Sequence, residues 1–151
     1  RRWEFRTDAA GPGARRGGSG VHYEADIQSP ATWSFRAEGL DTPSGYGVQG
    51  GAIGAVGEVW VWPEDESADG PNFVPPKYGV RRLGPARMIA NTPGGGGWGD
   101  PFARPPELVL RDVRDGVVSR AAAARDYGVV LTADGRSVDV SATSTERGKH
   151  S

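Results

Sequence analysis

Apolar and polar residues alternate along two neighbouring segments near the start of the chain. In residues 21–28, apolar side chains fall on one face and charged or polar side chains on the other. Residues 32–37 continue the alternation after a Ser-Pro turn. Two alternating runs joined by a short turn predict an antiparallel hairpin with one face toward water. Trp3 and Phe5 alternate with charged residues and predict another half-buried strand.

Two further strands are predicted, with long loops before and between them. Residues 58–62 read Glu-Val-Trp-Val-Trp and end at a proline, and residues 86–91 form a short apolar run. Residues 39–57 are rich in glycine and predict a loop rather than a regular element. Residues 64–76 are acidic and then proline-rich, a composition typical of a surface excursion.

The spacing of apolar residues changes to three and four after a Pro-Pro pair at 105–106. Proline has a fixed φ that suits the first turn of a helix, so the pair predicts a helix start. Val109 and Val113 lie on the apolar face of this helix, and Gly116 ends it. The charged residues between them, Asp112 included, are expected to face water.

A second short helix is predicted over residues 120–127. Ser119 is suited to cap its start, and Gly128 is suited to end it. An Asp-Gly turn then predicts a terminal hairpin of residues 129–131 and 137–140, with apolar residues on one face.

Together these elements predict a mainly β (α+β) fold. We expect an antiparallel β domain over residues 1–140, with two short helices and a terminal β-hairpin near the C-terminus. Residues 141–151 are polar and predict a disordered tail. The chain contains 24 glycines and 12 prolines but also five tryptophans, which together indicate a loop-rich folded chain.

Charge and composition exclude several classes of function. The net charge is −1, so the chain lacks the basic surface that nucleic-acid binding needs. Cysteine is absent, which excludes disulfides, thiolate zinc sites and thiol nucleophiles. No apolar run approaches the roughly 20 residues that span a bilayer. We therefore expect neither a nucleic-acid nor a membrane partner, and a cytoplasmic location.

Three motifs resemble one known family. The segment from Asn91 reads NTPGGGGWGDPFARPPELVLRDVRDGVVSRAAAARDYGVVL, and the segment from Gly11 reads GPGARRGGSGVHYE. A looser match is the glycine-rich stretch 43–57. In this order and spacing, covering nearly the whole chain, they resemble the C-terminal portion of the B-type subunit of the hydantoinase, oxoprolinase and carboxylase family. The resemblance implies that residues 1–140 are the C-terminal domain of such a subunit and belong to a longer chain.

The resemblance also implies a function. B-type subunits act with an A-type subunit of actin-like ATPase fold, which uses ATP to phosphorylate a carbonyl oxygen. The implied reaction is hydrolysis of a cyclic amide, such as N-methylhydantoin or 5-oxoproline. The implied partners are the A-type subunit and the remainder of the B-type subunit. ATP and a divalent metal are expected in the complete complex, with neither bound by this chain alone. An acetone- or acetophenone-type carboxylase and a non-catalytic assembly module are the alternatives.

The run of glycines after Pro93 is the first candidate site. Consecutive glycines can turn their N–H groups inward and hold an anion, although no Lys-Ser/Thr follows as in a P-loop. The alternative is a tight turn whose last residue caps the following helix. An arginine before a Gly-Gly pair could meet an anionic substrate, or form a structural salt bridge. The candidate substrate- or anion-binding residues are Arg16, Gly94, Gly95, Gly96, Gly97 and Asp100.

Other groups of polar or aromatic residues give weaker evidence for a functional site. His22, Glu24 and Asp26 share a strand face, but side chains two apart on a strand lie about 7 Å apart. A solvated face is therefore preferred to a metal site, and no metal ligands are assigned. Without cysteine, and with one histidine in the folded part, no nucleophile–base pair can be assembled. The catalytic residues thus stay unknown, and the isolated chain is expected to be inactive. Trp60 and Trp62 share a face and are interpreted as core or interface.

Overall fold

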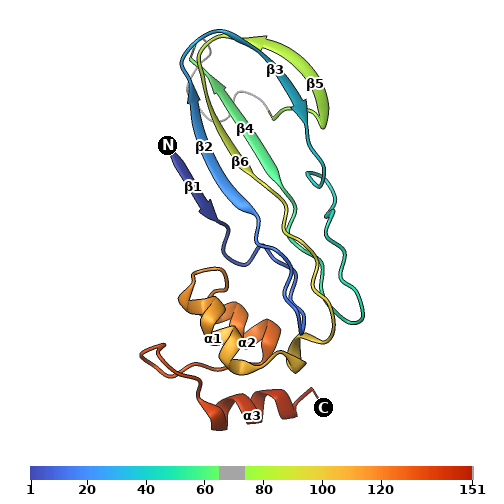
Figure 1. The fold of residues 1–151 in the computed structure, drawn as a ribbon, viewed down its shortest axis with the longest axis vertical. Coiled ribbons are helices and arrows are strands. Elements are labelled where there is room, and N and C mark those ends of the chain that lie inside the picture. Colours follow the sequence, from blue (N-terminus) through green and yellow to red (C-terminus); the bar gives the residue numbers. More distant parts are fainter. Residues whose placement is uncertain (65–73, 151) are drawn as a thin grey trace.

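The chain forms a long sheet region at one end and a group of helices at the other, joined by glycine-rich segments (Figure 1). This computed structural model describes residues 1–64 and 74–150. Most of the predicted excursion at 64–76 lies outside the described residues. The elements are β1 (Arg2–Phe5), β2 (Val21–Ile27), β3 (Ala31–Arg36), β4 (Glu58–Pro63), β5 (Tyr78–Leu83), β6 (Ala86–Asn91), the 3-10 helix η1 (Pro101–Ala103), α1 (Pro106–Arg114), α2 (Arg120–Tyr127) and α3 (Val140–Gly148).

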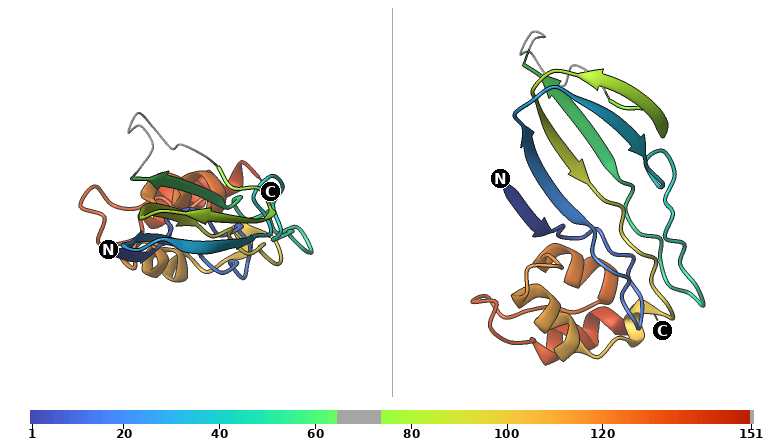
Figure 2. Two further views of the ribbon diagram at one scale, coloured as in Figure 1. Left: turned by 90° about the horizontal axis from the view of Figure 1, so that it is seen from above. Right: turned by 45° about the horizontal axis from the view of Figure 1, so that its top comes forward.

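The strands form two antiparallel sheets. The larger has the order β1-β2-β6-β4, and β3 pairs with β5 in a separate two-stranded sheet. Figure 2 shows the β3–β5 pair curving over the end of the larger sheet that is distant from the helices. The antiparallel α+β fold predicted from the sequence is confirmed.

The predicted hairpin of residues 21–28 with 32–37 is wrong. β2 pairs instead with β1 and β6, with Ala25 opposite Met88, and β3 pairs with β5. The turn between β2 and β3 carries the chain out of one sheet and into the other. β5 was not predicted, because most of its side chains are exposed and its alternation is weak.

The core of the sheet region lies between the two sheets. Val61 is fully buried and contacts Leu83 and Ala86, with Trp33 and Phe35 of β3 packed against them. Alternation along β4 therefore places its valines inward. Trp60 and Trp62 lie on the opposite face and are half-buried.

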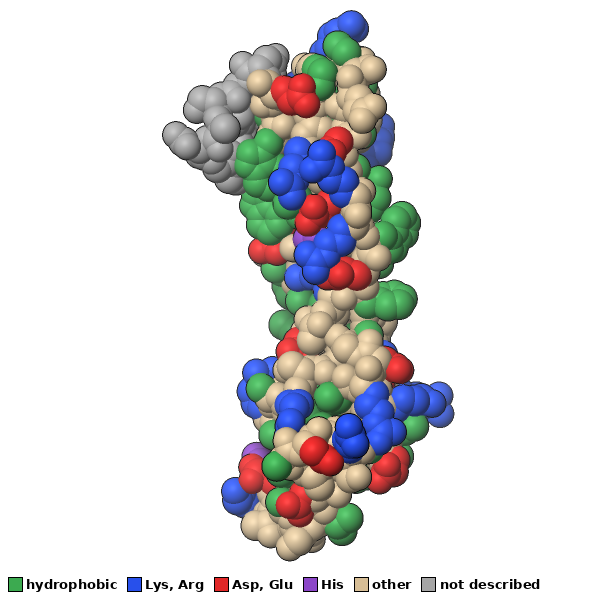
Figure 3. All heavy atoms as spheres, turned by 90° about the vertical axis from the view of Figure 1, so that its left-hand side faces the viewer, with side chains coloured by type: hydrophobic (Ala, Val, Ile, Leu, Met, Phe, Trp, Pro, Cys, Tyr) green, Lys and Arg blue, Asp and Glu red, His purple; other side chains and the backbone are tan. Residues whose placement is uncertain are grey.

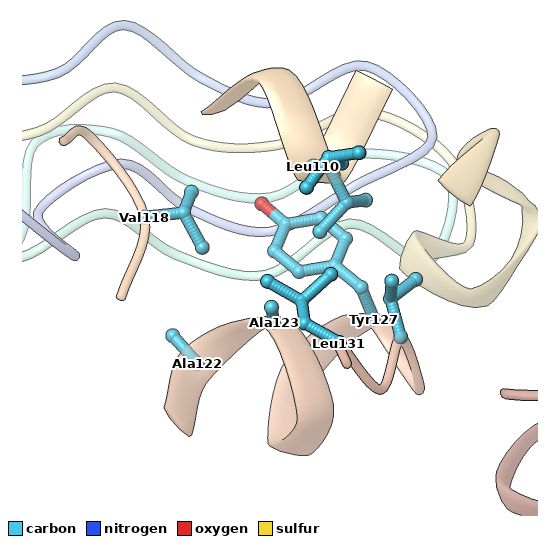
Figure 4. Close-up of a cluster of buried hydrophobic side chains, with 8 residues drawn as sticks. Leu110, Val118, Ala122, Ala123, Tyr127 and Leu131 are labelled. Atoms are coloured by element: carbon cyan, nitrogen blue, oxygen red, sulfur yellow. The ribbon is translucent and has the colours of Figure 1, made fainter. Parts of the chain in front are cut away.

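The helices surround a second core centred on Tyr127, whose ring lies between side chains of α1 and α2 (Figure 4). α2 has the predicted bounds because its ends are fixed locally. The Ser119 side chain accepts a hydrogen bond from the Ala122 amide, and Gly128 has a φ of 60°. α1 also forms where it was predicted.

The end of the chain differs from the expectation. In the region of the predicted terminal hairpin, Leu131 pairs with Val138, and backbone hydrogen bonds join Thr132 to Ser137 and Asp139 to Val130. Val140 is the first residue of α3, which occupies most of the predicted disordered tail, 141–151. The helix starts there because the Asp139 side chain accepts a hydrogen bond from the Ala142 amide.

α3 is held to the rest of the structure by partly buried polar contacts. The hydroxyl of Thr143 accepts a hydrogen bond from the amide of Val130 at 3.0 Å and donates one to its carbonyl at 3.3 Å. Arg147 donates hydrogen bonds to the carbonyls of Tyr127 and Arg104. These side-chain contacts are long-range and cannot be read from the polar composition of the segment.

Replacing Thr143 by valine should lower the free energy of unfolding by about 1–3 kcal/mol. The substitution keeps the side-chain shape but removes the hydroxyl partner of both backbone groups of Val130. Chemical denaturation would measure the loss. Thr145→Val is the matched control, because the exposed Thr145 hydroxyl bonds only within the helix. A similar loss of stability in both variants would contradict the role of Thr143 in holding α3 to the rest of the structure.

No helix in residues 1–64 or 74–150 is long and apolar enough to cross a membrane.

Candidate functional site

Three glycine-rich segments lie side by side between the sheets and the helices. We call residues 9–19, 45–57 and 93–99 the glycine layer. Their backbones bond to one another rather than to a regular sheet: the Gly11 amide donates to the Gly95 carbonyl at 2.8 Å, and the Gly97 amide donates to the Ala52 carbonyl at 2.9 Å. The backbone N–H and C=O groups of the layer thus find hydrogen-bond partners within the layer itself.

Gly94, Gly96 and Gly97 are needed for this close backbone packing, whereas a Cβ atom on Gly95 would come no nearer than 3.1 Å to another residue. A Cβ atom on Gly94 would lie 1.7 Å from the Ala9 carbonyl oxygen, and one on Gly96 would lie 1.9 Å from the Tyr46 carbonyl oxygen. Both distances are far below van der Waals contact, so no other residue fits here without backbone movement.

Most of the amides in this run already have partners. Gly94, Gly95 and Gly97 donate their N–H groups to the carbonyls of Ala55, Gly18 and Ala52. In this conformation their amides point toward three different places in the layer rather than into one concave nest. Anion binding by these glycines stays a prediction, and it would depend on the Gly96 amide.

Asp100 stands at the start of η1. Its exposed side chain accepts a hydrogen bond from the Phe102 amide at 2.9 Å. This is the capping arrangement of the tight-turn interpretation. The contact uses one carboxylate oxygen and fixes how the chain leaves the glycine layer.

Arg16 enters a buried ionic cluster with Asp112 and Arg104. Arg104 donates to Asp112 Oδ2 through Nε at 3.2 Å and Nη2 at 2.8 Å, and to the Ala14 carbonyl through Nη1. Arg16 Nε lies 3.5 Å from the same Oδ2. Asp112 and Arg104 are 4% and 7% exposed. One buried carboxylate therefore ties the glycine layer to the helices.

The Arg16 head group also has neighbours in its own loop. Its Nη1 donates to the Gly17 carbonyl and to the Ser19 hydroxyl, both at 2.9 Å. These contacts match the structural alternative considered for this residue, a salt bridge within the fold. Binding of an anionic substrate by Arg16 stays a prediction.

Tyr127 lies beside this cluster and is 1% exposed. Burial raises the pKa of its hydroxyl to about 12; the positive charge of Arg104 opposes this rise, and the negative charge of Asp112 adds to it. The folded state therefore favours the neutral phenol more strongly than the unfolded state does.

Stability should consequently fall at high pH. The contribution of the neutral Tyr127 is fully present below the unfolded pKa of about 10 and is lost as the pH rises toward about 12. The loss should amount to about 3 kcal/mol. Absorbance at 295 nm should show a tyrosine that titrates near pH 12, and this step is abolished by Tyr127→Phe but remains in Tyr46→Phe. A Tyr127→Phe chain that retains the late step would contradict this assignment.

A cavity of about 440 Å³ opens between the glycine layer and α2. Its polar lining comes from Asp8, Arg125, Asp126 and Tyr127. The volume is in the range of small-molecule sites. Its charged groups already have partners, because Arg125 bonds Asp126 and Asp8 accepts from the Ser119 amide.

The polar face of the larger sheet forms a cross-strand network. His22 lies 2.8 Å from the Asn91 amide oxygen through Nδ1 and 3.0 Å from Glu24 through Nε2. The hydrogen bond from His22 is the largest cause of a lowered pKa at the Glu24 carboxyl. The hydrogen bond and positive charge of Arg87 lower it further. Asp26 pairs instead with Arg1. Within residues 1–64 and 74–150, no group of three His, Cys, Asp or Glu residues could hold a metal.

Sequence reasoning missed Asp112, Arg104 and Tyr127, and it wrongly expected Asp112 to face water. A signal was present, because Asp112 lies three residues after the buried Val109 and therefore near the inner helix face. Its arginine partners could not be identified from spacing, since Arg16 lies in a distant loop.

Known proteins that resemble this chain in sequence include subunits of enzymes. The beta subunit of a caprolactamase from Pseudomonas jessenii is 35% identical over 99% of this chain and 26% of that protein. A chain named as the B-type component of a D-/L-hydantoinase from Pseudomonas sp. strain NS671 is 31% identical over 97% of this chain and 24% of that protein. The chain thus spans about a quarter of the length of these relatives.

Solved structures agree with these sequence matches. The ATP-dependent caprolactamase from Pseudomonas jessenii superposes with a TM-score of 0.69 and 31% identity, over 97% of this chain and 25% of that chain. A nucleotide-free acetone carboxylase superposes with a TM-score of 0.70 over 98% of this chain and 24% of that chain. Its 22% identity shows a common fold alone. The family model described as hydantoinase B/oxoprolinase matches residues 1–101, and the chain belongs to this family.

Proposed function

We propose that this chain is part of the B-type subunit of an ATP-dependent enzyme that hydrolyses a cyclic amide such as N-methylhydantoin or 5-oxoproline. The observation that carries the proposal is the family match over residues 1–101. Two relatives with 31–35% identity are named for hydrolysis of caprolactam or hydantoins, which are cyclic amides. Hydrolysis is therefore preferred to carboxylation, since the acetone carboxylase likeness rests on the fold.

In this proposal the chain supports chemistry that occurs elsewhere in the complex. Its described residues do not fit a divalent metal, because no acidic or histidine triad is present among them. The glycine run is not followed by the Lys-Ser/Thr of a phosphate-binding loop. ATP and metal would then be held by an A-type subunit of actin-like ATPase fold and by the remainder of the B-type subunit.

The proposed role of the chain is to present a rigid surface. Backbone bonds across the glycine layer and the Arg16–Asp112–Arg104 cluster fix the layer against the helices. Rigid support of this kind keeps reacting groups in place without contributing one of them.

Reconstitution tests the proposal. A tagged chain should co-purify with an A-type subunit, with a complete B-type subunit as the positive control. The isolated chain should hydrolyse neither ATP nor a cyclic amide, while the complete complex should couple ATP hydrolysis to ring opening of 5-oxoproline or N-methylhydantoin. Failure of the chain to bind under conditions in which the positive control does bind would contradict the proposal. Fixation of labelled bicarbonate onto acetone would favour the carboxylase, and binding without any turnover would favour an assembly module.

A further inference from the structure

β1 is an exposed edge strand with aromatic side chains. All four of its residues are exposed, and Trp3 and Phe5 are 75% and 66% accessible. Both project from the sheet face that carries Tyr23, and Trp3 contacts the Tyr23 ring edge-on at 5.4 Å. In Figures 1 and 2 no described segment lies beyond β1. Exposed apolar edges of this kind readily accept another strand.

The register of β1 shows which backbone groups are available. The Arg6 amide donates to the Gly20 carbonyl at 2.8 Å, so position 6 is hydrogen-bonded to the neighbouring strand. Such pairs alternate along an antiparallel ladder. Arg2 and Glu4 therefore direct their backbone groups toward β2. The N–H and C=O groups of Trp3 and Phe5 point outward, at the same residues whose side chains are exposed.

Charges along the strand select its partner. Arg2 and Glu4 flank Trp3 on the opposite face, where their side chains are 54% and 48% exposed and form an ion pair with each other, so pairing with a second copy would exchange this contact for two equivalent ones. Figure 3 looks onto this edge and shows Lys/Arg and Asp/Glu side chains interspersed along the sheet. A strand that pairs here should place an acidic residue opposite Arg2 and a basic residue opposite Glu4. The sequence Arg-Trp-Glu satisfies both requirements when it is read antiparallel to itself.

We propose that two copies of this chain associate through β1, with Trp3 of one copy opposite Trp3 of the other across a twofold axis. The outward backbone groups of the two Trp3 residues then bond each other, and each Arg2 faces Glu4 of the second copy. The two four-stranded sheets become one continuous sheet. This inference does not depend on the proposed enzymatic function.

Neighbouring registers fit less well. Centring the pair on Glu4 would oppose Glu4 to itself and Arg2 to Arg6, and like charges opposite each other destabilise a sheet. Centring it on Phe5 would need the strand to extend to Asp8. Asp8 has a φ of 58°, and the Arg6 side chain is bonded to the carbonyls of Val56 and Thr92. Neither feature is compatible with a longer edge strand.

Mass measurements test the association. The interface is short, so the weight-average mass should rise from 15.9 kDa toward twice that value over roughly 1–100 µM. Glu4→Arg should keep the chain monomeric, because it opposes Arg2 to a second arginine. Arg2→Glu combined with Glu4→Arg restores opposite charges and should restore the dimer. Glu107→Arg makes the same charge change at an exposed position of α1 and should not alter the mass.

Disulfide cross-linking tests the register of the proposed strand pair. The natural chain has no cysteine, so each variant carries one thiol per copy. In the proposed register the two Trp3 Cα atoms lie about 5.5 Å apart, within the range of a disulfide. Trp3→Cys should form a covalent dimer under mild oxidation, whereas Phe5→Cys should not, because its copies are too far apart.

Three results would overturn the proposal. These are a wild-type mass of 15.9 kDa at every concentration, a dimer that survives Glu4→Arg, or cross-linking of Phe5→Cys as readily as Trp3→Cys. Capture of Trp3→Cys only by a longer B-type or A-type chain would assign the edge to that chain instead. Circular dichroism should show the wild-type fold in every variant, since all of these positions are exposed.

Discussion

Replacing Asp112 by alanine should lower the free energy of unfolding by about 3–5 kcal/mol. The carboxylate is 4% exposed and is the shared partner of Arg104 and Arg16. Its removal leaves a buried Arg104 guanidinium that keeps a hydrogen bond to the Ala14 carbonyl but loses its counter-ion. A buried charge without its counter-ion costs more than the pair contributes, so the loss should be far larger than for a surface ion pair.

Two further variants separate charge from packing. Asp115→Ala removes the same side chain three residues later, where it is exposed, and should change stability by less than about 0.5 kcal/mol. Adding Arg104→Met to Asp112→Ala removes the unpaired charge and should recover part of the loss. Urea denaturation measures all three. A loss below about 1 kcal/mol for Asp112→Ala would show that the cluster does not hold the glycine layer to the helices.

The sequence predicted best those elements whose limits depend on nearby residues. α2 begins and ends where Ser119 and Gly128 indicated, because a cap bonds within the first turn and a left-handed glycine ends the last one. α1 followed its proline pair and its three-four apolar spacing. Strand segments were also recognisable, since alternation reports that one face is buried.

Strand partners could not be found in the same way. Alternation in β2 and β3 is equally compatible with pairing to each other or to distant strands. The pairing of β2 with β6 depends on contacts between residues about sixty to seventy positions apart, such as Ala25 with Met88. α3 was missed for a related reason, because its polar residues gain a docking surface only when Val130 and Tyr127 are in place.

For the candidate site, the sequence located a special segment but not its physical role. A run of glycines shows that side chains are not tolerated, and this holds for an anion nest and for close backbone packing alike. The choice depends on what lies opposite each Cα, which only the folded chain shows. Here the Ala9 and Tyr46 carbonyls lie opposite Gly94 and Gly96.

Gly94→Ala should therefore be among the most destabilising single changes in the chain, with a loss of at least about 3 kcal/mol. The new Cβ would lie 1.7 Å from the carbonyl oxygen of Ala9, which is itself 2% exposed and bonded to the Ala55 amide. Relief requires the backbone of one segment to move, and that movement breaks hydrogen bonds across the glycine layer. The methyl group is obstructed by backbone atoms and not by a flexible side chain, so side-chain repacking cannot relieve the clash.

Gly18→Ala is the matched control, in the same layer and on the same type of residue. A Cβ there meets nothing within 4 Å, and its φ is not in the left-handed region. It should leave stability unchanged or raise it by about 0.4–1 kcal/mol, since alanine restricts the unfolded chain. Thermal and urea unfolding compare the two variants directly. Equal unfolding midpoints for the two variants would mean that the backbone around Gly94 moves at little energetic cost. Such a backbone could also turn its amides toward an anionic ligand.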